Sequence, residues 1–103
     1  MSIGEIILNC KKYKDTDEMM HIVFARKVDN RFLPNSDAIV LELTLEEMEM
    51  DLIDISNSKC PGYEYFLEMF ILQDFYDDLQ NLEEYKLDEK KVEGVIYYAE
   101  FDA

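Results

Sequence analysis

Apolar and polar side chains alternate in two stretches of the first half of the chain, which is the pattern of a strand with one buried face. In the stretch MHIVFARKV, residues 20–28, Ile22, Phe24 and Val28 fall on one side. The stretch AIVLELT, residues 38–44, is built in the same way. Between them, DNRFLPNSD gathers the Asp, Asn, Pro and Ser that are typical of a loop. We therefore predict an antiparallel hairpin with a long connection.

Helical periodicity follows the second of these stretches. Thr44 and, three residues later, Glu47 match a capping box, in which a hydroxyl and a carboxylate each bind a backbone N–H at a helix start. Apolar residues then recur at steps of three and four, at Leu45, Met48, Leu52 and Ile55. We predict a helix over residues 45–55, ended by the turn-forming residues 56–62.

Residues 63–85 form one continuous stretch without Gly or Pro. Helical spacing relates the apolar side chains of Tyr65, Met69, Leu72, Tyr76 and Leu79. We predict one long helix with a buried first half and an amphipathic second half. A buried strand within residues 63–72 stays open as an alternative, because a short apolar run suits both structures.

The two ends of the chain are rich in strand-forming residues. GEIILNC, residues 4–10, and VEGVIYYAEF, residues 92–101, are therefore both predicted to be strands. The resulting order favours an α+β fold, with an antiparallel sheet of about four strands and two helices packed on one face. The 103 residues fit a single domain.

The composition is that of an ordered protein. Apolar residues make up 49% of the chain, including six Phe and seven Tyr, which is enough for a core despite 33% charged residues. The first residues do not resemble a secretory signal, and no apolar run approaches the roughly 20 residues that span a bilayer. We expect a cytoplasmic protein in which Cys10 and Cys60 are free thiols.

Charge is unevenly distributed along the chain, whose net charge is −14. Residues 1–36 carry six Lys or Arg and five acidic residues, a balance of +1, whereas residues 37–103 carry four Lys and nineteen acidic residues, a balance of −15. Such a segment repels nucleic acid phosphates and anionic lipids and attracts basic proteins. We therefore expect a basic protein partner, with no direct binding of nucleic acid and no membrane binding.

The sequence contains no recognisable catalytic signature. His21 is the only histidine, and neither Cys10 nor Cys60 lies in a local pattern that would pair it with His21 as a thiol nucleophile. No Gly-rich phosphate loop occurs. We predict that the protein is not an enzyme and has no catalytic residues and no cofactor.

Two clusters of acidic residues resemble metal sites only in part. Asp15, Asp17 and Glu18 resemble the start of a calcium loop, but its central Gly and terminal Glu are missing. The acids between residues 77 and 84 could gather a divalent ion only loosely. We predict no metal ligands.

The strongest candidate is an acidic surface interleaved with Tyr. No Lys or Arg occurs at residues 45–58 or 60–85, although helices usually mix both signs of charge for support. Acids beside a Tyr attract a basic partner that the ring then anchors. The alternative is that any helix over a core has a charged outer face. The predicted contact residues are Glu47, Asp51, Asp54, Asp74, Asp77, Asp78 and Tyr85.

Two classes of function follow from this surface. The first is a small acidic inhibitor of the immunity or antitoxin type, which occludes the basic active site of a toxin such as a nuclease; a nucleic-acid-mimicking anti-defence protein is a variant. In size and acidity the chain is similar to bacterial toxin-immunity proteins as a broad group, without a shared motif. The second is a structural or adaptor subunit, which could be a homodimer, because residues 63–76 are unusually apolar. A regulatory subunit of a basic enzyme is a third.

Overall fold

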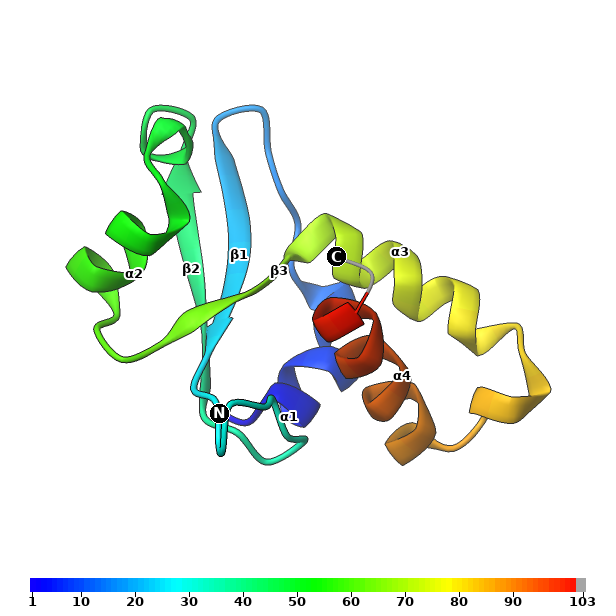
Figure 1. Ribbon diagram of the computed structural model, residues 1–103. Coiled ribbons are helices and arrows are strands. Elements are labelled where there is room, and N and C mark those ends of the chain that lie inside the picture. The colour runs from blue at the N-terminus through cyan, green and yellow to red at the C-terminus, as the bar shows by residue number, and fades with distance from the viewer. Residues whose placement is uncertain (102–103) are drawn as a thin grey trace.

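The computed structural model describes residues 1–101 and is built around a three-stranded antiparallel sheet (Figure 1). Strand β1 (Met19–Ala25) lies in the centre, between β2 (Ala38–Thr44) and β3 (Glu64–Glu68). The predicted hairpin is confirmed, since β1 and β2 pair antiparallel along their whole length. The α+β class is also confirmed, with fewer strands and more helices than predicted.

Helices cover both faces of the sheet (Figure 1). Ile22 and Phe24 of β1 point to one face, which is covered by α2 (Leu52–Lys59). Val23 and Ala25 point to the other face. That face is covered by α1 (Ile3–Leu8), α3 (Met69–Gln80) and α4 (Asp88–Phe101). The prediction of helices on one face is wrong, because β1 is apolar on both sides and each side needs a cover.

The larger core lies between the sheet and the three helices α1, α3 and α4. Elements from both ends of the chain contribute fully buried side chains, among them Ile3, Ile7, Leu67, Leu72 and Val95. Burying a side chain of this size contributes roughly 1.5–3 kcal/mol to folding. Among residues 1–101, none of the helices combines the length and the apolar character needed to cross a bilayer.

The N-terminal segment is a helix, so the strand predicted for residues 4–10 is wrong. The buried residues are Ile3, Ile6, Ile7 and Cys10. This spacing is that of one helix face. Glu5 N–H donates to Ser2 Oγ at 3.1 Å, and Ser2 N–H donates to Glu5 Oε1 at 3.0 Å. These two hydrogen bonds form a capping box at the start of α1. A short 3₁₀ turn, η1 (Cys10–Lys12), follows the helix.

The strand predicted for residues 92–101 is also wrong, because these residues form most of α4. Their buried and half-buried apolar side chains again show helical spacing, at Val92, Val95, Ile96 and Ala99. A Cβ on Gly94 would lie 2.9 Å from Leu79 Cδ1 and 3.0 Å from Tyr85 Cε1. Gly94 therefore allows α4 to approach α3 and the short turn η3 (Glu83–Tyr85) closely.

The predicted capping box at Thr44 forms, but it does not start an α-helix. Thr44 N–H donates to Glu47 Oε1 at 3.0 Å, and Glu47 N–H donates to Thr44 Oγ1 at 3.2 Å. A turn and the 3₁₀ segment η2 (Glu47–Glu49) follow, and α2 begins only at Leu52. The helix predicted over residues 45–55 is thus confirmed only in its last part.

Residues 63–85 contain both a strand and a helix. The strand β3 matches the alternative that the sequence left open, and α3 lies within the predicted helix. The pairing of β1 with β3 shifts between Val23 and Phe24, which is a β-bulge. Phe66 and Leu67 are consequently buried in the same core, although neighbours in a regular strand face opposite sides. This irregularity hides the strand from an analysis of periodicity.

Candidate protein-binding surface

The first group of predicted contact residues lies at the start of α2. Asp51 precedes the helix and Asp54 belongs to its first turn, and both are exposed. The positive end of the helix dipole favours carboxylates at these positions. Within residues 1–101, neither side chain forms an ion pair or caps the helix. Both carboxylates are therefore available to a partner.

Ile53 lies between these two acids in the sequence and is 73% exposed, more than the other exposed large apolar side chains of the described residues. It lines a hollow of about 210 Å³ with Leu52 and Tyr65, and Lys27 is the basic residue at this hollow. Ile53 is not among the contact residues predicted from the sequence. Its position outside the apolar stripe of a short amphipathic helix was the available signal.

Glu47, in contrast, is engaged within the protein. Its carboxylate lies 2.6 Å from Lys59 Nζ and accepts a hydrogen bond from the Thr44 N–H. The hydrogen bond from Lys59, followed by that from Thr44, lowers the pKa of Glu47 from 4.5 to about 2. This carboxylate connects the end of β2 to the end of α2.

The second group of predicted contact residues lies on α3. Asp74 and Asp78 are exposed and lie one helical turn apart. Within residues 1–101 neither forms an ion pair, whereas Asp77 pairs with Lys11 of η1. The hydrogen bond to Asp77 raises the pKa of Lys11. Asp77 thus joins α3 to the segment after α1, whereas Asp74 and Asp78 face solvent.

Tyr85, the one aromatic residue among the predicted contacts, is half-buried. Its ring packs against Gly94 of α4 and contacts the larger core. It also lines a hollow of about 450 Å³ together with Phe75 and Tyr97. Much of the ring is therefore used in packing η3 against α4, and the rest faces this hollow.

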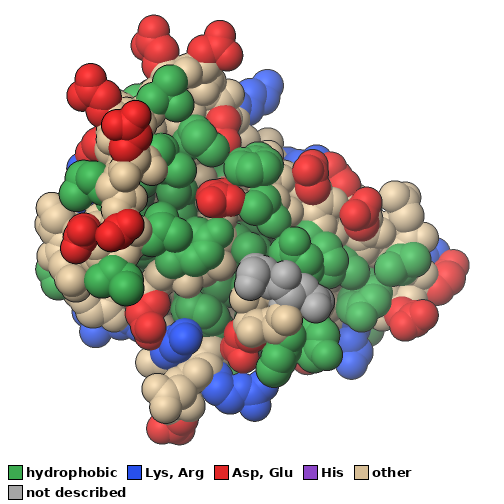
Figure 2. All heavy atoms as spheres, turned by 45° about the horizontal axis from the view of Figure 1, so that its top comes forward, with side chains coloured by type: hydrophobic (Ala, Val, Ile, Leu, Met, Phe, Trp, Pro, Cys, Tyr) green, Lys and Arg blue, Asp and Glu red, His purple; other side chains and the backbone are tan. Residues whose placement is uncertain are grey.

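The sheet separates the two acidic groups. The group at α2 accompanies the smaller core, and the group on α3 accompanies the larger core on the opposite face of the sheet. Figure 2 shows hydrophobic side chains gathered between α2 on one side and α3 and α4 on the other, with acidic side chains on both flanks. The predicted contact residues thus form two acidic edges instead of one continuous patch.

An exposed aromatic pair adds to the apolar surface of α4. Tyr97 and Phe101 are each 62% exposed, and their ring centroids lie 4.8 Å apart. The sequence analysis assigned both to a strand, so it did not identify them as neighbours on a helix. Their spacing of four residues was the signal that could have done so.

The side chains considered for catalysis are separated or engaged elsewhere. His21 Nδ1 lies 2.8 Å from Asp15 Oδ1, and His21 Nε2 lies 3.2 Å from Glu42 Oε2. Cys10 is buried in the larger core, where burial raises the pKa of its thiol to about 11. Cys60 is buried in the smaller core, and burial also raises its pKa. Both are free thiols, and neither pKa shift favours a thiolate nucleophile.

Among residues 1–101, no three His, Cys, Asp or Glu side chains are grouped so that they could hold a metal ion. No protein family, curated protein or solved structure matches the chain.

Proposed function

We propose that this protein binds a basic protein through the start of α2 and acts as an inhibitor of the immunity or antitoxin type, which occludes a cationic active site such as that of a nuclease toxin. The supporting observation is the combination at α2 of two exposed carboxylates without an intramolecular partner, Asp51 and Asp54, with the exposed Ile53 between them.

The charge of the whole chain supports recruitment of a basic partner. The net charge of −14 is carried by residues 37–103, and the exposed acids of both α2 and α3 belong to this part. A field of this sign accelerates encounter with a cationic protein and repels nucleic acid. Added salt screens the field, so association slows as ionic strength rises.

Ile53 supplies the apolar contact that charge alone lacks. Charged groups mainly set the encounter rate and the specificity, whereas a buried apolar side chain at the centre of an interface contributes affinity. Complete burial of an Ile side chain contributes roughly 1.5–3 kcal/mol, which corresponds to a change of about 10- to 100-fold in Kd. We place Ile53 in a pocket of the partner, with Asp51 and Asp54 beside cationic residues that would otherwise bind substrate phosphates.

The exposed pair of Tyr97 and Phe101 supports a second candidate, an adaptor subunit that docks through apolar contacts of α4. The two candidates use different surfaces, because α2 and α4 cover opposite faces of the sheet. Self-association is less favoured than either, since two copies would each bring a net charge of −14.

The test uses a panel of basic toxin and nuclease domains, including any that a neighbouring gene encodes, with binding measured by calorimetry and inhibition by a cleavage assay. The wild type should bind and inhibit, with Kd rising between about 50 mM and about 300 mM NaCl. Asp51→Asn/Asp54→Asn and, separately, Ile53→Ala should each weaken binding by about tenfold or more.

The matched control is Glu89→Gln/Glu93→Gln on α4, which removes the same charge from the other side of the sheet and should change Kd little. The proposal is overturned if the wild type does not bind at low salt, or if the α2 variants bind as the control does. The adaptor candidate would be supported instead if Tyr97→Ala/Phe101→Ala lost binding while the α2 variants still bound as the wild type does.

A further inference from the structure

The outer edge of β2 is open over part of its length. β2 is the first strand in the sheet order, so only one of its edges pairs with β1. Arg26 N–H donates to Asp37 O at 2.8 Å, which sets the phase of the antiparallel ladder. Alternate residues therefore exchange hydrogen bonds with β1, and the residues between them direct their N–H and C=O groups outward. The outward set comprises Ala38, Val40, Glu42 and Thr44.

Both ends of this edge are occupied by the protein itself. Ala38 N–H donates to Met1 O at 2.7 Å, because the N-terminal segment bridges Ser2 with Asp37. At the other end Thr44 N–H binds Glu47 Oε1. Between these ends, the outward backbone groups of Val40 and Glu42 have no hydrogen-bond partner among residues 1–101. One short segment of strand edge is thus unpaired.

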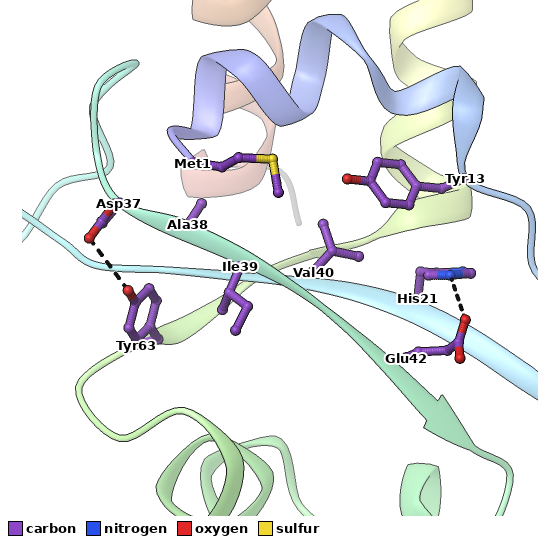
Figure 3. Close-up of a pocket in the computed structure, with 9 residues that line it drawn as sticks. All are labelled: Met1, Tyr13, His21, Asp37, Ala38, Ile39, Val40, Glu42 and Tyr63. Carbon is purple, nitrogen blue, oxygen red and sulfur yellow. Dashed lines mark hydrogen bonds and ion pairs between the residues drawn. The ribbon is translucent and has the colours of Figure 1, made fainter.

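A groove of about 650 Å³ follows this segment (Figure 3). Met1 and Tyr13 lie on one side of β2, and Tyr63 lies on the other side. Asp37 lies at one end of the groove, where it accepts a hydrogen bond from Tyr63 Oη at 3.5 Å. Glu42, paired with His21, lies at the other end. The groove therefore combines unpaired backbone groups, aromatic walls and a carboxylate at each end.

We propose that this edge of β2 pairs with an extended basic segment of a partner protein, which adds a fourth strand to the sheet. Main-chain hydrogen bonds to Val40 and Glu42 would supply affinity, and the walls of the groove would select apolar side chains on alternate positions. The inference rests on the proposed function only in taking the partner to be basic. The binding surface itself is separate from Asp51, Ile53 and Asp54 of α2.

Charge identifies the occupant as a basic segment. The groove is lined by two carboxylates, Asp37 and Glu42, and by no Lys or Arg side chain; its one cationic group is the α-amino group of Met1. Arg26 and Lys12 lie over the aromatic walls, with Arg26 4.8 Å from the centre of the Tyr63 ring and Lys12 5.8 Å from that of Tyr13, so the excess negative charge of the whole molecule, −14, is what favours a basic occupant.

Pairing with a second copy of the chain is disfavoured by charge. Two β2 edges would bring together two molecules of net charge −14. A cationic strand instead meets a carboxylate at each end of the groove.

The experiment uses peptides of about seven residues in which Val alternates with Lys or Thr, a length typical of one strand. One version is N-methylated on the amides that would face β2, and a matched version is N-methylated on the amides that would face solvent. A third version replaces Lys with Glu. Binding to the full chain is followed by NMR, through shifts and hydrogen exchange of the Val40 and Glu42 amides.

The unmodified and the solvent-side N-methylated peptides should bind and slow amide exchange at Val40 and Glu42, while the other two should bind at least about tenfold more weakly. Equal binding of both N-methylated versions would overturn strand addition, and so would unchanged exchange at Val40 and Glu42 with every peptide. Protection of these amides in the protein alone, together with a dimer by light scattering, would assign the edge to a second copy.

The same sample separates this inference from the proposed function. If the basic partner domain binds in an Asp51-dependent manner while exchange at Val40 and Glu42 is unchanged, the strand-edge inference fails and the proposed function stands. If no basic domain binds but the peptide pairs with β2, the proposed function fails and the inference stands.

Discussion

At the scale of single residues, neighbouring carboxylates of this protein have different roles. Glu47 is held by Lys59 and by the backbone of Thr44, whereas Asp51 and Asp54 form no ion pair within residues 1–101. An acidic side chain that is already hydrogen-bonded must lose those bonds before it can serve a partner. The sequence shows where acids occur, and their local partners determine which of them are available.

The depressed pKa of Glu47 leads to a prediction about pH. Glu47→Gln keeps the capping box and removes the charge that Lys59 binds. Because the folded pKa is about 2 and the ordinary value is 4.5, the ionised carboxylate stabilises the fold above pH 4.5, and this contribution is lost as pH falls toward 2. The wild type should therefore unfold at higher urea concentration than Glu47→Gln near neutral pH, with a gap that closes on acidification.

The measurement is a series of urea unfolding curves between about pH 7 and about pH 3. Glu46→Gln, which removes an exposed neighbouring charge, serves as the control and should show a smaller gap. A gap between Glu47→Gln and the wild type that is constant over this range would contradict the assignment.

At the scale of elements, α3 is joined to the segment after α1 by one side chain. Gln73 Nε2 donates to Cys10 O at 2.8 Å and to Tyr13 O at 2.7 Å. Cys10 is the first residue of η1 and Tyr13 is the residue that follows it. Gln73 thus satisfies two backbone acceptors of another element and sets the position of Tyr13 at the groove beside β2.

We predict that Gln73→Met destabilises the fold by about 1–3 kcal/mol, because it removes the Gln73 hydrogen bond to Tyr13 O and leaves Cys10 O with the Tyr13 N–H alone, while nearly keeping the side-chain volume. Gln80→Met, an exposed position on the same helix, should change stability by less than about 0.5 kcal/mol. Urea unfolding measures both variants. If the two variants had equal free energies of unfolding, the prediction would be wrong, because water would then replace the hydrogen bonds of Gln73 without loss of stability.

At the scale of the whole molecule, excess negative charge opposes folding. The ion pairs of the described residues involve mostly exposed side chains, which contribute little each, while a net charge of −14 is repulsive throughout. The same negative electrostatic field that lowers the stability of the fold would attract a basic partner. The cost itself can be measured without knowing the partner.

We predict that NaCl stabilises the isolated protein. The thermal midpoint should rise between about 20 mM and about 300 mM NaCl, because screening relieves more repulsion than it removes from exposed ion pairs. Asp74→Asn/Asp78→Asn should show a smaller rise, since less repulsion remains to be screened. A midpoint that falls with salt in the wild type would mean that its ion pairs outweigh its repulsion.

Local pattern was sufficient for part of the structure. The β-branched and aromatic stretches on either side of a loop predict the β1–β2 hairpin, the Thr44 capping box forms as predicted, and helical spacing identifies α3. The helices α1 and α4 also had the correct spacing, as in Ile3, Ile6 and Ile7. Their strand-forming residues favour a strand, and residues 92–101 also alternate acceptably, but the packing of an apolar helix face outweighs such propensities.

The sequence by itself determined the α+β class, the central hairpin and the acidic surplus of residues 37–103, because these depend on local period and composition. Only the tertiary structure decided that residues 64–68 form a strand ahead of α3. The bulge in the pairing of β3 with β1 buries Phe66 and Leu67 in the same core, and this pattern depends on contacts with β1. The tertiary structure also placed the two acidic groups on opposite faces of the sheet. It left the side chain of Ile53 exposed to solvent and the edge of β2 unpaired at Val40. Each of these depends on contacts between segments distant in the chain, which no local pattern records.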